Sequence, residues 1–162
     1  MTVFVCTACD RSIAGPLTKL PEVPVRPMDQ GFPKADGSRR ATPTLPLGFF
    51  ALEPEPWGAP LLPSDECREV FAGGPCLSDP NGDGFLVSAG PRNTVILHPD
   101  DASGLQPHPD WKKHSGGCCG FDGQSGMNQL CPCGAEVGTL ISECNTAYEL
   151  HLDPGQVRSI TA

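Results

Sequence analysis

The chain has 162 residues and a formal net charge of −8, a length that suits one domain with a single modest core. It contains 19 acidic against 11 basic residues, and its basic residues form no run longer than a pair, so the clustered Lys and Arg of nucleic-acid binding are missing. No stretch has the length of a transmembrane helix or the composition of a secretory signal. We therefore expect a cytoplasmic protein that binds neither nucleic acid nor membrane.

Glycine and proline, at 19 residues each, oppose long helices, because Pro lacks a backbone donor and Gly costs about 1 kcal/mol in a helix interior. We expect a mostly β fold of short strands and long loops, in which residues 1–162 form one domain. A chain with so few core residues needs a covalent or metal staple. In a reducing compartment its nine cysteines favour metal binding over disulfides.

The first expected element is a strand over residues 3–5, which leads into Cys6-Thr7-Ala8-Cys9, and a second strand starts with residues 12–14. A C-x2-C turn between two strands presents both thiolates on one side, as zinc knuckles do. Cys6 and Cys9 are therefore candidate metal ligands.

Residues 21–63 contain ten prolines, which predicts an extended excursion or insertion and not a helix. Only residues 45–52 have the composition of a strand. We expect an ordered flap over the sheet, with disorder near residues 33–44 and with Trp57 exposed or half-covered.

Cys67 and Cys76 stand nine residues apart, which matches no common metal pattern, so they are separate buried thiols or part of a second metal site. The following Asp79 and Asp83 copy the first half of an EF-hand loop, but Gly90 stands where the bidentate Glu should be. The loop fits better as a turn that enters a strand.

Residues 85–89 and 94–97 are the clearest central strands, and the turn at residues 90–93 predicts that they form a hairpin. His98 and His108 each precede Pro-Asp. Histidine is a usual zinc ligand and acid–base group, but two surface turns explain this repeat equally well.

The last third of the chain holds Cys118-Cys119, Cys131-Pro132-Cys133 and Cys144. Consecutive side chains diverge in an extended chain, so we expect one of the adjacent thiols to point inward and one outward.

A predicted hairpin of residues 137–141 and 148–152 has Cys144 near its bend. Its second strand alternates, with Tyr148, Leu150 and Leu152 on the buried face and Glu149 and His151 on the solvent face.

Together the two knuckles predict one Zn²⁺ with four thiolate ligands, Cys6, Cys9, Cys131 and Cys133. Cys118, Cys119 and Cys144 are the alternatives for any of these positions. A zinc ion with four thiolates is coordinatively closed and stabilises structure, whereas catalysis needs an open position.

The two knuckles, with residues 134–139 after the second, resemble the zinc ribbons of β-tent proteins: the Yippee proteins, the thalidomide-binding domain of cereblon and the methionine-R-sulfoxide reductases. The segment from Cys118 to Cys144 also resembles small uncharacterised bacterial zinc-knuckle proteins. The first resemblance implies a zinc-stapled sheet. The reductases carry a late cysteine near an Asn, which Cys144-Asn145 resembles, although Glu143 replaces the basic surroundings of that cysteine.

Three functions stay open at this point. The first is a binding module for an unidentified protein or small-molecule ligand, with Trp57, Phe49, Phe50 and Trp111 as contact residues unless they are core aromatics. The second is a thiol oxidoreductase that uses Cys144 or the Cys118-Cys119 pair. The third is a catalytic zinc with His98, His108 or His114 as a ligand. The closed thiolate set favours the first, without enzymatic activity.

Overall fold

The structure is a computed structural model that describes residues 1–114 and 116–162, and the fold is mostly β, with 34% strand and 4% helix. The strands are β1 (Thr2–Cys6), β2 (Ser12–Lys19), β3 (Phe49–Glu53), β4 (Leu61–Ser64), β5 (Leu77–Ser78), β6 (Phe85–Ser88), β7 (Thr94–Leu97), β8 (Gln106–Pro107), β9 (Gln129–Leu130), β10 (Glu136–Ile141), β11 (Glu149–Leu152) and β12 (Val157–Thr161). Two single-turn 3₁₀ helices cover Pro99–Asp101 and Trp111–Lys113. The predicted fold class is confirmed.

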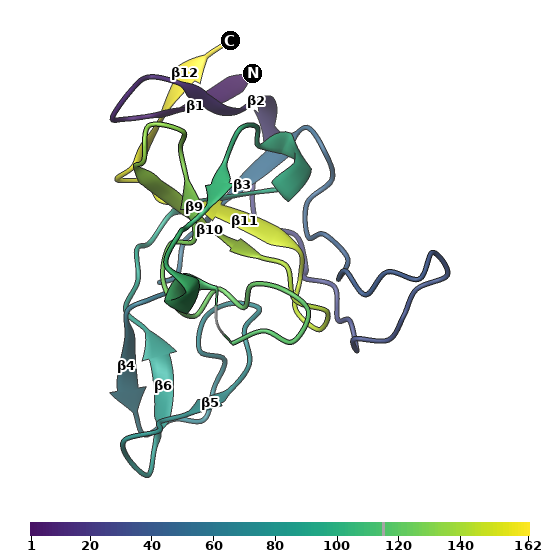
Figure 1. Cartoon of the computed structure of the whole chain (residues 1–162), viewed down its shortest axis with the longest axis vertical. Helices are drawn as coiled ribbons and strands as arrows, with labels where there is room; N and C mark the ends of the chain where they lie inside the picture. The colour runs from purple at the N-terminus through teal and green to yellow at the C-terminus, as the bar shows by residue number, and fades with distance from the viewer. Residues whose placement is uncertain (115) are drawn as a thin grey trace.

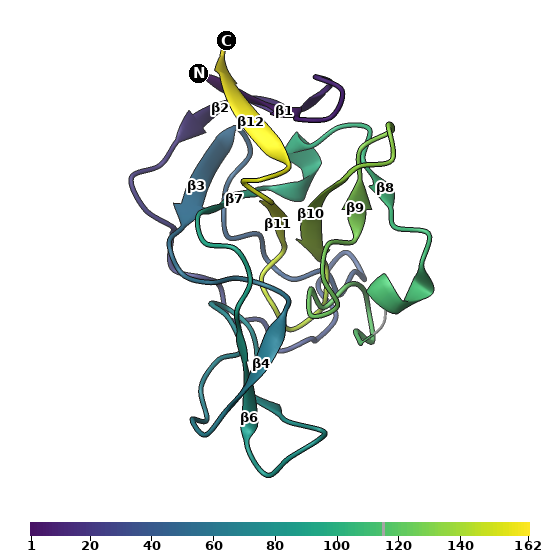
Figure 2. The same ribbon diagram turned by 90° about the vertical axis from the view of Figure 1, so that its left-hand side faces the viewer.

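The strands form two sheets (Figure 1). The larger has nine strands in the order β12-β1-β2-β3-β7-β11-β10-β9-β8, and the smaller has the order β4-β6-β5. The β2–β3 pair is parallel and the other named pairs are antiparallel. β12 pairs with β1 along its whole length, so both termini lie at the same end, opposite the small sheet (Figure 2).

Both predicted hairpins that carry cysteines are present. β1 pairs with β2 around the first knuckle, and β10 pairs with β11 with Cys144 in the connection between them. The Asp79 loop is the expected turn into a strand, since it joins β5 to β6 and the Asp79 N–H donates to the Gly84 carbonyl at 2.9 Å.

The predicted hairpin of residues 85–89 and 94–97 is wrong. β6 lies between β4 and β5 in the small sheet, whereas β7 lies between β3 and β11 in the large one. The link between β6 and β7 runs along the backbone of Trp57, whose N–H donates to the Pro91 carbonyl at 3.1 Å. β7 is buried at all four positions and pairs with β3 on one side and β11 on the other, so it is a central strand of the large sheet and has no free edge for β6.

The excursion over residues 21–63 contains β3 and the first three residues of β4, and its first part projects beside the large sheet (Figure 1). The strand expected within residues 45–52 is β3. Residues 33–44, where we expected disorder, contain a turn closed by the Lys34 N–H and the Ser38 carbonyl at 2.8 Å. The Asp29 carboxylate then accepts the Thr42 N–H at 2.8 Å and joins the two limbs of the loop.

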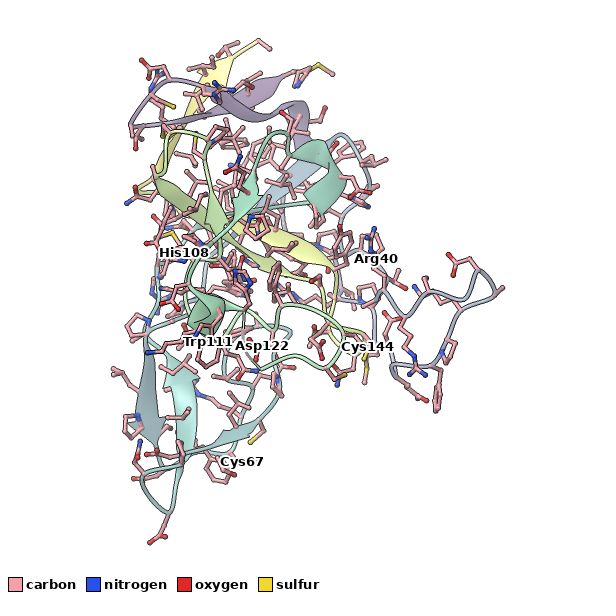
Figure 3. All side chains as sticks on the ribbon, viewed as in Figure 1. Arg40, Cys67, His108, Trp111, Asp122 and Cys144 are labelled. Carbon is pink, nitrogen blue, oxygen red and sulfur yellow. The ribbon has the colours of Figure 1, made fainter. Side chains whose placement is uncertain are left out.

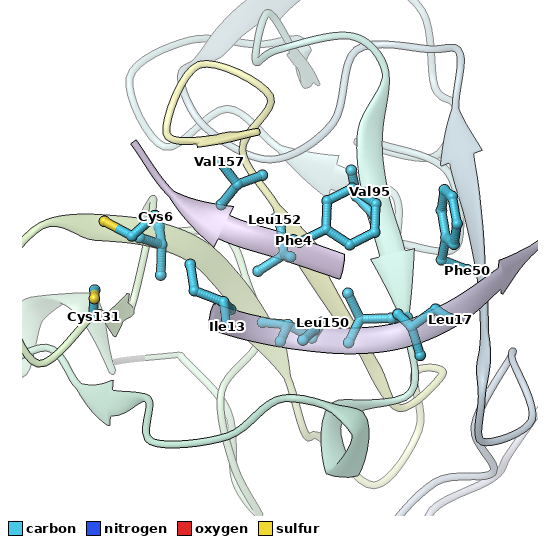
Figure 4. Close-up of a cluster of buried hydrophobic side chains, with 13 residues drawn as sticks. Phe4, Cys6, Ile13, Leu17, Phe50, Val95, Cys131, Leu150, Leu152 and Val157 are labelled. Atoms are coloured by element: carbon cyan, nitrogen blue, oxygen red, sulfur yellow. The ribbon is translucent and has the colours of Figure 1, made fainter. Parts of the chain in front are cut away.

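The main core lies between the β1–β2 hairpin and the rest of the large sheet (Figure 4), and Phe4 meets Phe50 edge to face there, with ring centroids 4.9 Å apart. A second cluster forms around Trp57, Phe71 and Ile141 where the two sheets meet. Trp57 is only 2% exposed, so its predicted exposure is wrong. Its indole packs on Phe71 and donates a hydrogen bond to the Ala72 carbonyl at 3.3 Å.

Candidate metal centre

The first knuckle begins at the end of β1. Asp10 adopts a left-handed conformation, with φ of 59°, and its N–H donates to the Cys6 carbonyl at 2.9 Å. Aspartate tolerates this conformation better than most residues. The turn brings Cys6 and Cys9 to the same side of the chain.

The second knuckle is built in the same way just before β10. The Gly134 N–H donates to the Cys131 carbonyl at 2.8 Å, and the Cys131 N–H donates to the Ala135 carbonyl at 2.9 Å. Gly134 has φ of 93°, which glycine adopts without steric cost. This turn allows the sulfurs of Cys131 and Cys133 to face the same metal position, although only one residue separates the two cysteines.

The structure brings the four predicted ligands together. The sulfurs of Cys6, Cys9, Cys131 and Cys133 all lie within 4.8 Å of one another. The Cys6–Cys133 and Cys9–Cys131 pairs are 3.8 and 3.6 Å apart. In a tetrahedral site with Zn–S bonds of about 2.3 Å, neighbouring sulfurs are separated by about 3.8 Å. The donor set therefore fits a zinc ion.

Cys6 and Cys131 are buried at the edge of the main core, of which they are members (Figure 4). Cys9 and Cys133 are exposed. Burial raises the pKa of the Cys131 thiol to about 12, whereas a backbone hydrogen bond at Ala135 lowers the pKa of Cys133 to about 7. A buried thiolate needs a neighbouring positive charge, which a bound cation would supply.

The histidines that follow the central strands are not part of this cluster. The Nδ1 atoms of His98 and His108 accept the N–H groups of Asp100 and Asp110 at 3.1 and 3.0 Å. His98 is the N-cap of the first 3₁₀ helix, and the ring of His108 closes the turn that leads to Asp110, the N-cap of the second. Both histidines thus lie in turns, as one of the two interpretations predicted. In residues 1–114 and 116–162, no histidine belongs to either sulfur cluster, and this includes the third candidate, His114.

A second cluster holds Cys118, Cys119 and Cys144. The Cys118 sulfur lies 3.5 Å from that of Cys119 and 3.7 Å from that of Cys144. The expectation that Cys118 and Cys119 diverge is wrong, because the loop is not extended. Oε1 of Glu143 accepts the N–H groups of Cys119 and Gly120 at 2.6 and 2.8 Å, and this turns both thiols toward Cys144.

Cys67 and Cys76 form an exposed pair at the small sheet, with sulfurs 2.8 Å apart (Figure 3 labels Cys67). They are therefore not separate buried thiols. No further His, Cys, Asp or Glu of the described residues joins them in a group of three metal-ligand atoms.

Sequence reasoning missed a polar network on the inner face of β11. Glu149 and His151, predicted to face solvent, are each 1% exposed. His151 Nε2 donates to Glu149 at 2.7 Å, so its Nδ1 accepts the Thr94 hydroxyl at 2.9 Å. Burial lowers the pKa of His151, which stays neutral. Arg26, from the excursion, donates to both Glu53 and Glu149.

A cavity of about 280 Å³ opens over this network. Trp57 and His151 stack in its wall, with ring centroids 3.4 Å apart and planes inclined by 10°. Thr94, Thr139 and Lys113 add hydroxyl and ammonium groups. The alternation of β11 gave no sign of this site, because the second layer that covers Glu149 and His151 comes from segments distant in the sequence.

Comparison of the chain with protein-family models, with curated proteins and with solved structures gives no match. In the part of the chain that the structure describes, no helix has both the length and the apolar character needed to cross a membrane.

Proposed function

We propose that the protein is a zinc protein in which Cys6, Cys9, Cys131 and Cys133 hold one Zn²⁺ that stabilises the fold. The convergence of four sulfurs from two knuckles 122 residues apart in sequence carries this proposal. Four thiolates leave no coordination position for a substrate, so the role of this ion is structural. The likeness of the knuckles to β-tent zinc proteins and a cytoplasmic location are parts of the same proposal.

The test is the zinc content of the protein purified under reducing conditions, compared with that of single Cys→Ser variants. Cys9→Ser and Cys133→Ser change exposed ligands and should each retain at least one equivalent of zinc less than the wild type. Cys67→Ser changes an exposed thiol outside both clusters and is the matched control. Equal zinc content in all four proteins would contradict the proposal.

We further infer that the domain is a binding module for a small polar ligand, seated in the cavity beside Trp57 and His151. An aromatic wall next to a few convergent polar groups is the usual composition of a small-molecule site. Of the four candidate contact aromatics, Trp57 alone lines this cavity; Phe50 is buried in the main core and Trp111 is 70% exposed on the surface.

A screen of small polar compounds by protein-observed NMR tests this inference. Compounds that bind should shift the resonances of Thr94, Thr139 and His151. The Lys113→Ala substitution should lower the affinity of these compounds. Arg92→Ala, at an exposed site, is the control. Shifts that cluster elsewhere would contradict the inference.

The alternative, a thiol oxidoreductase that uses Cys144, requires a thiolate at neutral pH. Cys144 is 7% exposed, and its contact with the thiol of Cys119, together with burial, raises its pKa. The neighbouring thiols likewise raise the pKa of Cys118 to about 12. A raised pKa lowers the thiolate fraction at neutral pH and so weighs against a nucleophilic Cys144, and we place the binding module first.

A further inference from the structure

The three thiols of Cys118, Cys119 and Cys144 meet at a place that the structural zinc does not explain. Their sulfurs all lie within 4.8 Å of one another, and the Cys118 sulfur is 3.5 Å from that of Cys119 and 3.7 Å from that of Cys144. These values again match the sulfur–sulfur edge of about 3.8 Å in a zinc–thiolate tetrahedron. Oε2 of Glu143 lies 3.6 Å from the Cys118 sulfur, but among the described residues no His, Asp or Glu atom lies within 4.8 Å of all three sulfurs.

The surrounding chain holds this geometry in place. The buried carboxylate of Glu143 binds two consecutive N–H groups of the 118–120 loop, and the Phe121 N–H donates to Ser142 Oγ at 3.0 Å. Gly120 packs so closely that a Cβ atom there would lie 2.4 Å from the Ser142 carbonyl oxygen. Three hydrogen bonds and one close contact thus fix the loop against the bend between β10 and β11.

A disulfide explains this arrangement less well than a metal does. Any one disulfide would use two of the three sulfurs and leave the third unpaired beside it. A bond between the adjacent Cys118 and Cys119 would also strain the intervening peptide. A thiolate-preferring cation uses all three sulfurs at once.

The fourth side of the cluster faces outward. Cys118 and Cys119 are exposed, whereas Cys144 is buried. A cavity of about 220 Å³ adjoins Cys119 and is lined by Arg39, Arg40 and Ser142. Figure 3 shows Arg40 and Cys144 on the same side of the molecule, where the excursion passes the large sheet. Arg39 donates to the Gly31 carbonyl at 3.0 Å and the Arg40 guanidinium lies over the Tyr148 ring at 4.6 Å. The two positive charges in the lining of this cavity favour a small anion there.

We propose that Cys118, Cys119 and Cys144 form a second metal site for a thiolate-preferring cation such as Zn²⁺, with a fourth position open to a small anion. The site differs in kind from the closed four-thiolate cluster. Three protein ligands with one exchangeable position are the arrangement through which a zinc ion acts on a bound ligand.

The first experiment counts zinc ions after saturation with Zn²⁺ and gel filtration under reducing conditions. The wild type should retain two per chain, and Cys119→Ser and Cys144→Ser should retain one each with an unchanged circular dichroism spectrum. Cys119 is exposed, so its variant tests the site even if the buried Cys144→Ser variant does not fold. Cys67→Ser should retain two.

One zinc ion in both the wild type and Cys119→Ser would overturn the second site without affecting the structural one. A Cys118–Cys144 disulfide that mass spectrometry detects in protein purified with a reductant would also overturn the second site. Cys119→Ser should keep the structural ion, whereas Cys9→Ser should lose the structural ion and, with the fold, the second one, so failure of either proposal is recognised separately.

The second experiment tests the open position with Co²⁺ as the bound metal and azide as the anion. Azide should change the visible absorption spectrum of the wild type and leave that of Cys119→Ser unchanged. The double variant Arg39→Gln/Arg40→Gln should still bind two metal ions but require several-fold more azide. A wild-type spectrum that azide does not alter would refute the open position.

Discussion

Arg26 is the residue whose role the sequence conceals most completely. It lies between Val25 and Pro27 in the excursion, where any charged residue is expected to be solvated. In the structure its Nη2 lies 2.8 Å from Glu53 and its Nε 2.9 Å from Glu149, and both carboxylates are buried. Although burial opposes ionisation, the hydrogen bond from His151 and the charge of Arg26 lower the pKa of Glu149. The excursion is thus anchored by a cation over two buried anions.

Replacement of Arg26 by Met should destabilise the protein by about 3–5 kcal/mol, because it leaves two buried carboxylates without their cation. The matched control is Arg92→Met. Arg92 pairs with Glu55 at 3.1 Å on the surface, where an ion pair contributes about 0–1 kcal/mol. Urea unfolding of the zinc-loaded proteins measures both effects. A similar, small loss in the two variants would show that Arg26 is not an anchor.

At the scale of single elements, the knuckles could be predicted and the strand pairing could not. The spacing of Cys6 and Cys9, and the glycine after Cys133, are local signals, and each turn forms from hydrogen bonds within six residues. The pairing of β6 with β4, and of β7 with β3, depends on contacts across the excursion. A local turn signal at residues 90–93 cannot reveal such pairing, because the link bonds to Trp57 instead of closing a hairpin.

Gly134→Ala tests the second knuckle as an element. Its φ of 93° costs a residue with a Cβ atom about 1–2 kcal/mol, while open space surrounds the added methyl group, so the cost is conformational. We expect weaker zinc binding by roughly tenfold, measured by competition with a chromophoric chelator, since 1.4 kcal/mol is a factor of ten.

The control for this variant is Gly37→Ala. Gly37 has φ of 80° and equally open surroundings, but it lies in the excursion, away from the knuckles. This variant carries comparable backbone strain and should bind zinc as the wild type does. If both variants bind zinc normally, the left-handed turn at Gly134 does not position Cys133.

At the scale of the whole molecule, the proposed zinc ion connects β1, near one edge of the large sheet, with the turn before β10, near the opposite edge. Cys6 closes β1, which pairs with both β2 and β12, and Cys131 and Cys133 precede β10. The sequence predicted this staple from cysteine spacing alone. It could not predict that the second cluster, at the bend between β10 and β11, ties another loop to the same sheet, because adjacent cysteines carry no pairing signal until the loop between them is folded.

Removal of the structural zinc should unfold the domain and not merely loosen one end. Zinc binding in finger peptides provides about 10–16 kcal/mol, whereas a whole domain is stable by about 5–15 kcal/mol. The Cys119→Ser variant suits this test, since by our proposal it holds the structural ion alone. With EDTA and a reductant, its far-ultraviolet circular dichroism should change and its melting transition should disappear, and added Zn²⁺ should restore both. If metal analysis confirms that the ion is gone while spectrum and melting curve stay the same, the main core and the Trp57 cluster are sufficient for folding, and zinc at Cys6, Cys9, Cys131 and Cys133 would have to serve a purpose other than stability.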